Sequence, residues 1–125
     1  MRAFRIAVPA SDLDRSRAFY EQVLGMDADD TVPSRLYFHC GDVIVALIDR
    51  RSGPGVHPLP DHLYFATGEL DDVFERAVPA GAEITSPIEV RPWGERSFYC
   101  TDRDRHPLCF VDADTLFLGR GAEWR

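Results

Sequence analysis

The chain has 125 residues, which is the length of one ordinary domain or of two small units that share a core. Its formal net charge is −7, and its 14 basic residues are all arginines scattered along the sequence. We therefore expect no nucleic-acid partner. An acidic chain tolerates cationic ligands better than polyanions.

Cys40, Cys100 and Cys109 are an odd number of cysteines without a CxxC spacing. This pattern predicts free, mostly buried thiols in a reducing compartment. No apolar run approaches the roughly eighteen residues of a membrane span, and the N-terminus lacks the apolar segment of a signal peptide. We expect a cytoplasmic protein without a membrane partner.

The first half begins with a strand and a helix. Residues 4–9, FRIAVP, have the composition of a short strand that ends at its proline. Ser11 and Asp14 form a capping-box pattern, which predicts a helix over residues 12–24. Gly25 is placed to cap the end of this helix.

A hairpin is expected after this helix. A short strand is predicted near residues 26–32, followed by the apolar runs RLYFHC and VIVALID on either side of Gly41 and Asp42. Residues 50–60 hold two glycines and three prolines, which leaves little room for regular structure. We interpret this segment as a linker.

The order of elements then repeats. HLYFAT predicts a strand that His62 opens, and a helix from about Glu69 is closed by Gly81. AEITSPIEV predicts an irregular strand, and SFYCT and PLCFVD predict a second hairpin around the charged turn DRDRH. The helix is expected to bury the residues at helical spacing, namely Leu70, Val73, Phe74, Ala77 and Val78.

The two halves resemble one another. Residues 35–38, RLYF, echo residues 96–99, RSFY, and each precedes a polar turn and a strand that ends in Asp49 or Asp112. We predict an α+β fold of tandem βαβββ modules, whose curled mixed sheets form a cavity. The modules span residues 1–49 and 61–125, the second with a C-terminal tail, and together make one structural domain.

Two motifs resemble the vicinal-oxygen-chelate superfamily. SDLDRSRAFYEQVLG and PWGERSFYCTDRDRHPLCF are similar to its conserved patterns and together cover both halves of the chain. The superfamily includes glyoxalase I, bleomycin-resistance proteins, fosfomycin-resistance enzymes and extradiol dioxygenases. The resemblance implies a small-molecule ligand and a homodimer, with modules paired within or across chains. It does not by itself select a function.

The resemblance also implies four metal-ligand positions, which hold histidine or glutamate in catalytic members. They fall here on Arg5, Ala46, His62 and Cys109, of which only His62 is a usual ligand for such a site. We therefore expect no metal and no other cofactor, with a divalent metal at His62 as the less favoured alternative. The turn also departs from the pattern, because it lacks the usual Gly-Asn, so His106 is interpreted as a turn residue.

Three candidate residues have two interpretations each. Arg5 either clamps a substrate carboxylate or oxyanion or forms an ordinary ion pair. His62 either acts as a general base or lines the cavity as a hydrogen-bonding group. Trp93, in the Pro-Trp-Gly loop, either stacks on a ligand or packs on the edge of its own sheet.

Further ligand-binding candidates lie on the predicted strands: Tyr37, Arg96, Phe98 and Cys109. The sequence does not fix which sheet face carries Tyr37, His39, Arg96 or Phe98. Cys109 lies in an apolar strand, where the pKa of a thiol is expected to rise.

Three functions remain open. The first is metal-free binding of a small, antibiotic-like molecule that is cationic or aromatic. The second is a metal-independent isomerase, epimerase or lyase that uses His62 as base and Arg5 or Arg96 as oxyanion clamp. The third is a metal-dependent glyoxalase or dioxygenase. We favour the first.

Overall fold

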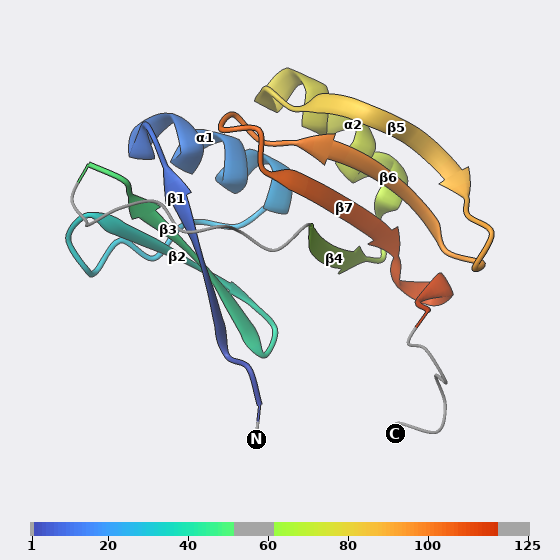
Figure 1. Cartoon of the computed structure of the whole chain (residues 1–125), viewed down its shortest axis with the longest axis horizontal. Helices are drawn as coiled ribbons and strands as arrows, with labels where there is room; N and C mark the ends of the chain where they lie inside the picture. The colour runs from blue at the N-terminus through green and yellow to red at the C-terminus, as the bar shows by residue number, and fades with distance from the viewer. Residues whose placement is uncertain (1, 52–61, 118–125) are drawn as a thin grey trace. The chain divides into compact units, whose positions relative to one another are not determined.

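The structure is a computed structural model that describes residues 2–51 and 62–117. These residues form two compact units, divided after residue 60. The first unit contains β1 (Arg5–Ala10), α1 (Leu13–Leu24), β2 (Arg35–Cys40) and β3 (Val43–Asp49) (Figure 1). The second contains β4 (Leu63–Thr67), α2 (Leu70–Ala80), β5 (Glu83–Val90), β6 (Arg96–Thr101), β7 (Pro107–Asp112) and the short 3₁₀ helix η1 (Ala113–Thr115). The predicted α+β class is confirmed.

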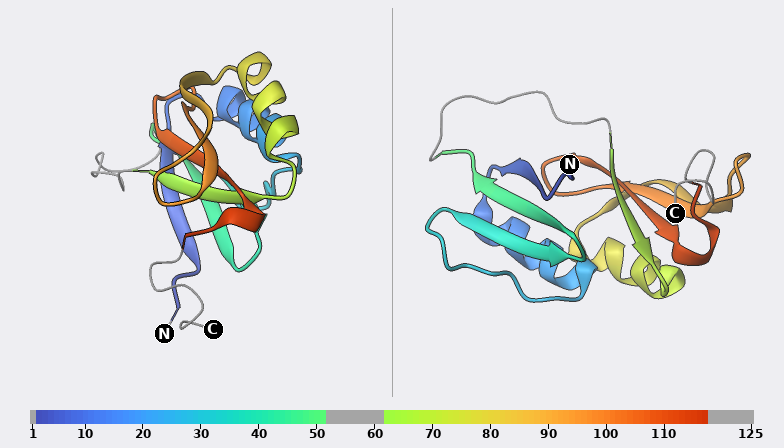
Figure 2. Two further views of the ribbon diagram at one scale, coloured as in Figure 1. Left: turned by 90° about the vertical axis from the view of Figure 1, so that its right-hand side faces the viewer. Right: turned by 90° about the horizontal axis from the view of Figure 1, so that it is seen from below.

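The first sheet has the strand order β1-β3-β2, with β1 parallel and β2 antiparallel to β3. Strand alternation places Phe38 and Val45 on one face. The ring of Tyr20 on α1 lies 5.8 Å from that of Phe38, so α1 covers this face (Figure 2). All three side chains are almost completely buried.

The second sheet has the order β4-β7-β6-β5, in which only the β4–β7 pair is parallel. The Phe98 ring lies 5.0 Å from Phe74 of α2 and 5.2 Å from Phe110 of β7. This aromatic contact fixes the core face, which α2 covers. Neither sheet closes into a barrel, so β4 and β5 are edge strands of their sheet.

Most predicted elements are confirmed, but the start of α1 differs from the expectation. The N-cap is Asp12, not Ser11, and its carboxylate accepts a hydrogen bond from the backbone N–H of Arg15 at 3.1 Å. Asp and Ser cap helices equally well, so the pattern alone did not separate them. Gly25 closes the helix with φ 69°, as expected.

Two further differences concern β1 and the segment after α1. β1 runs from Arg5 to Ala10 and so continues one residue beyond Pro9, where it was expected to end; a proline inside the strand is tolerated because β1 is an edge strand. The strand expected at 26–32 is reduced to one bridge between Asp29 and Tyr37. The Asp29 carboxylate accepts hydrogen bonds from the backbone N–H and hydroxyl of Thr31, which favours a turn there.

The second unit follows the prediction closely. α2 ends at Gly81 with φ 112°, although Val78, expected in its buried stripe, is 57% exposed. The strand His62 was expected to open begins one residue later, at Leu63. β5 carries two register shifts, which fits the predicted irregular strand. No helix in the described ranges is long and apolar enough to cross a membrane.

The charged turn between β6 and β7 is organised by a buried aspartate. Asp102 is 5% exposed, and its carboxylate accepts the backbone N–H groups of Asp104 and His106, each at 2.8 Å. Arg105 stands where the superfamily pattern has glycine and adopts φ 65°. Most of the predicted linker lies outside the described residues, and so does the end of the C-terminal tail, which holds Trp124, the second of the two tryptophans in the sequence.

Candidate ligand-binding site

The face of the second sheet that points away from α2 carries polar and aromatic side chains. Cys109 on β7 pairs with Tyr64 on β4 and with Tyr99 on β6. The His62 ring lies 5.4 Å from the Tyr99 ring and 5.9 Å from the Tyr64 ring. The structure thus brings two predicted site residues, His62 and Cys109, to one face.

The Cys109 thiol is fully buried and interacts with the hydroxyl groups of Tyr99 and Ser97. Burial raises the pKa of Cys109 despite these hydrogen bonds, in agreement with the expectation from sequence. Burial, together with the neighbouring Cys109, raises the pKa of Tyr99 to about 12. Both groups are therefore neutral near pH 7, where a thiol is a poor nucleophile and a poor metal ligand.

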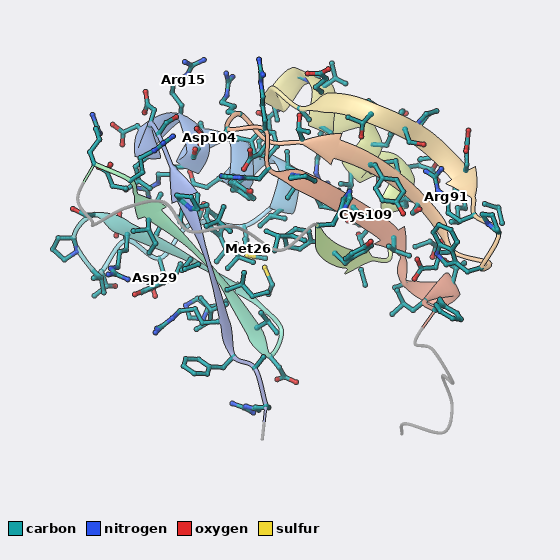
Figure 3. All side chains as sticks on the ribbon, viewed as in Figure 1. Arg15, Met26, Asp29, Arg91, Asp104 and Cys109 are labelled. Atoms are coloured by element: carbon teal, nitrogen blue, oxygen red, sulfur yellow. The ribbon has the colours of Figure 1, made fainter. Side chains whose placement is uncertain are left out.

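Arg91 is the most highly connected side chain on this face and was not predicted. Its side chain is 9% exposed, and its guanidinium carbon lies 4.9 Å from the centre of the Tyr99 ring. It donates to the hydroxyls of Ser86 and Ser97, to the backbone carbonyls of Pro87 and Ser97, and to the Glu89 carboxylate, at 2.9–3.0 Å. These five bonds use all five N–H groups of the guanidinium. Arg91 therefore fastens β5 to β6 (Figure 3).

A pocket of about 350 Å³ opens in the second unit. It lies between β4, β7, the Pro-Trp-Gly loop and the segment after η1. Aromatic and aliphatic side chains dominate its lining, with one acid: Tyr64, Phe65, Trp93, Glu95, Val111, Leu116 and Phe117. Trp93, proposed from sequence as a stacking residue, forms part of the wall and is 46% exposed.

Glu95 is the polar member of this wall and is only 8% exposed. One carboxylate oxygen accepts the indole N–H of Trp93 at 2.8 Å, and the other accepts the backbone N–H of Phe117 at 2.9 Å. Sequence reasoning missed Glu95, because a glutamate in a polar loop is ordinarily solvated. Its position next to the Pro-Trp-Gly motif was the available signal.

Arg96 and Phe98 point to the other face of the sheet. Phe98 has no exposed surface and belongs to the core under α2. Arg96 donates to the Asp71 carboxylate on α2 at 2.8 Å and lies 3.7 Å from the Asp112 carboxylate. Its guanidinium thus ties β6 to the start of α2 rather than facing the pocket.

Arg5 and Tyr37 lie together in the first unit, on the face opposite α1. The Arg5 guanidinium lies 5.9 Å from the Tyr37 ring and 5.2 Å from the Phe4 ring. Ala46, fully buried, pairs with Tyr37 in the sheet. Arg5 and His62 belong to different units, and each is defined here by contacts within its own unit.

The four positions that bear metal ligands in the superfamily do not fit a divalent metal in this chain. Arg5 is a permanent cation that repels a metal, and Ala46 has no donor atom. The pKa of Cys109 is raised by burial, which disfavours the thiolate that a metal requires. Within residues 2–51 and 62–117, no three His, Cys, Asp or Glu side chains gather into a cluster that could hold a metal ion.

The repeated strand and helix order, with its open mixed sheets, defines a duplicated α+β protein, and a family model identifies the family. The model of the Glyoxalase/Bleomycin resistance protein/Dioxygenase superfamily matches residues 2–110. The chain belongs to this superfamily, as the sequence motifs predicted. No curated protein matches the chain significantly in sequence.

Solved structures show the same fold at low sequence identity. A glyoxalase-related enzyme from Fulvimarina pelagi is 21% identical with a TM-score of 0.79, over 90% of this chain and 88% of that one. TioX from Micromonospora sp. ML1 is 20% identical with a TM-score of 0.70, over 90% and 99%. A lactoylglutathione lyase from Agrobacterium tumefaciens is 22% identical with a TM-score of 0.68, over 89% and 92%.

Proposed function

We propose that this protein binds a small, antibiotic-like molecule in the pocket of the second unit, without a metal. The observation that carries the proposal is the aromatic pocket beside the Pro-Trp-Gly loop. Its volume of about 350 Å³ lies in the range of small-molecule sites, which are mostly apolar with few polar groups. The side chains of Trp93, Tyr64 and Phe117 are 46%, 61% and 55% exposed, so their rings are available to a flat ligand.

The metal-free character rests on the side chains at the superfamily's ligand positions. A cation, a methyl group and a neutral buried thiol stand at three of the four positions, Arg5, Ala46 and Cys109. A protein that only binds its ligand does not require these three side chains to ionise or to coordinate a metal. The isomerase, epimerase or lyase alternative instead predicts that His62→Ala abolishes turnover of a substrate without unfolding the protein.

The test is a binding screen that follows Trp93 fluorescence against aromatic, glycopeptide and polycationic drugs. We expect saturable quenching by at least one class of drug. Tyr64→Ala should weaken binding about tenfold or more, because the ligand loses both the apolar area that the ring buries and a ring–ring interaction on the order of 1 kcal/mol. Trp93→Phe should remove the signal while Trp124 still fluoresces. Val90→Ala, an exposed apolar change outside the pocket wall, is the matched control.

Two results contradict the proposal. The first is that no compound of the panel quenches the Trp93 fluorescence, which means that the pocket binds none of these drug classes. Binding that disappears after dialysis against a chelator and returns with manganese, iron, nickel or zinc favours the metal-dependent alternative. In that case, one equivalent of metal per chain, lost in His62→Ala or Cys109→Ala, would place the ion at the superfamily position.

A further inference from the structure

A buried carboxylate at the wall of an apolar pocket needs an explanation. Both oxygens of Glu95 accept one hydrogen bond from a neutral donor, the Trp93 indole and the Phe117 amide. Ordinary loop glutamates remain in water, because a buried charge costs several kcal/mol or more unless it is paired. Glu95 as a residue is only 8% exposed, and it lines the pocket.

The negative charge of Glu95 has no cationic partner among residues 2–51 and 62–117. No ion pair joins it to an arginine or histidine of these ranges. The guanidinium of Arg91, four residues earlier, is fully committed to other acceptors. A carboxylate has about four lone-pair sites, so two hydrogen bonds leave acceptor capacity open.

The rest of the wall is suited to a cation as well as to an apolar group. Tyr64, Phe65, Trp93 and Phe117 supply aromatic rings around the same pocket. The faces of aromatic rings carry partial negative charge and attract ammonium groups, most strongly when the site is shielded from water. Four rings and one buried carboxylate are the components of a site for an organic cation.

We propose that the ligand of this pocket carries a single positive charge on an alkylated amine, which lies against Glu95 between the aromatic rings. This inference rests on the proposed function, because it assigns the charge of the ligand that the pocket binds. Glu95 has two roles: its hydrogen bonds hold Trp93 and the Phe117 backbone in place, and its charge selects cations over neutral molecules of the same shape.

The experiment uses two probes of nearly equal shape, phenyltrimethylammonium and tert-butylbenzene, in which a positive nitrogen replaces a neutral carbon. Dissociation constants are measured by ligand-observed NMR with the full chain. We expect the cation to bind about tenfold more tightly than the neutral probe. In Glu95→Gln this ratio should fall to about one. Both affinities also fall, because the amide NH2 of glutamine cannot accept the second of the two hydrogen bonds, so the ratio is the readout of the charge.

Two matched variants separate charge from architecture. Glu83→Gln removes the same charge from an exposed position at the start of β5, outside the pocket wall, and it should leave the ratio unchanged. Trp93→Phe keeps the Glu95 charge but removes the indole N–H; both affinities fall while the ratio persists. Circular dichroism checks the fold of each variant. If Glu95→Gln does not fold, the proposal is tested on the other two proteins: equal binding of the two probes to the wild type overturns it, and so does a loss of the cation preference in Glu83→Gln.

The outcomes distinguish the two proposals. Equal binding of both probes to the wild type overturns the charge selection but leaves small-molecule binding standing. A cation preference that survives in Glu95→Gln overturns the assignment to Glu95. If neither probe binds at any accessible concentration, both the inference and the proposed pocket are wrong.

Discussion

The guanidinium of Arg91 shows how a single side chain can organise a binding face without facing the ligand. Its five hydrogen bonds and its position over the Tyr99 ring join the bulged strand β5 to β6, just before the loop that carries Trp93. Because register shifts leave β5 with fewer ladder bonds, side-chain bonds take over part of that task. Arg91 is therefore a positioning residue for the pocket.

Replacing Arg91 by lysine tests this role, because lysine keeps the charge but lacks the planar fork of donors. We expect a loss of about 2 kcal/mol in the free energy of unfolding, since buried acceptors lose charge-assisted hydrogen bonds. Urea denaturation followed by circular dichroism measures the change. Arg35→Lys, on the exposed start of β2, is the control and should shift the midpoint little. Equal midpoints for the two variants would show that the network contributes nothing.

The three thiols should differ sharply in reactivity. All three are free; Cys100 and Cys109 are buried and Cys40 is partly exposed. Burial raises the pKa of each thiol, that of Cys100 to about 12. A disulfide reagent at pH 8 should therefore modify one thiol, Cys40, in the folded protein and all three in guanidinium. Cys40→Ser identifies the reactive group, and fast reaction of Cys109 in that variant contradicts the buried, protonated state.

The elements of this chain are more predictable than the orientation of their side chains. Gly25 and Gly81 end the two helices with positive φ, and such helix-ending glycines are visible in the sequence. The sequence did not show which side chains of β6 point toward α2, because Ser97, Phe98 and Cys100 are all buried and no alternation of polar and apolar residues marks one face. Glu95 and Arg91 were missed for a related reason: their burial depends on tertiary contacts with β6 and the segment after η1.

At the level of elements, the turn at Asp29 anchors the edge of β2. Backbone hydrogen bonds join Asp29, labelled in Figure 3, to Tyr37 in both directions, at 2.8 and 2.9 Å. The His39 ring nitrogen Nε2 lies 3.2 Å from the Asp29 carboxylate. Hydrogen bonds from the hydroxyl and the backbone N–H of Thr31, and then from His39, lower the pKa of Asp29 to about 2. The charged carboxylate is thus the form that supports the turn.

This lowered pKa predicts an acid-sensitive edge strand. A depressed pKa contributes stability that is present above the ordinary value of 3.8 and is lost as the pH falls toward about 2. Carbon-detected NMR of the Asp29 carboxyl should give a midpoint near 2, and protection of the Tyr37 amide should decline over the same interval. Thr31→Val removes the hydroxyl bond and should raise the midpoint toward 3.8. A wild-type midpoint already at the ordinary value contradicts the assignment.

For the molecule as a whole, two open sheets leave apolar groups at the surface. Outside the pocket wall, Phe4 is 53% exposed and Val90 72%, and exposed apolar groups of this size mark interaction surfaces when they gather into patches. The edge strands β4 and β5 each have a neighbour on one side only within their sheet. Natural proteins usually protect the unpaired backbone groups of such strands. Self-association is one way to cover such surfaces, and it agrees with the homodimer implied by the superfamily resemblance.

We therefore predict a homodimer in solution, with a mass twice the 14.1 kDa of one chain. Each chain carries a formal charge of −7, so two copies repel one another, and salt screens this repulsion. Raising sodium chloride from roughly 0.05 to 0.5 M should therefore tighten an apolar dimer, whereas it would weaken one held by ion pairs. Sedimentation equilibrium at several concentrations measures both the mass and the salt response. A single-chain mass at every concentration contradicts the homodimer, and dissociation with added salt would show that charge pairs, rather than apolar surfaces, hold the two chains together.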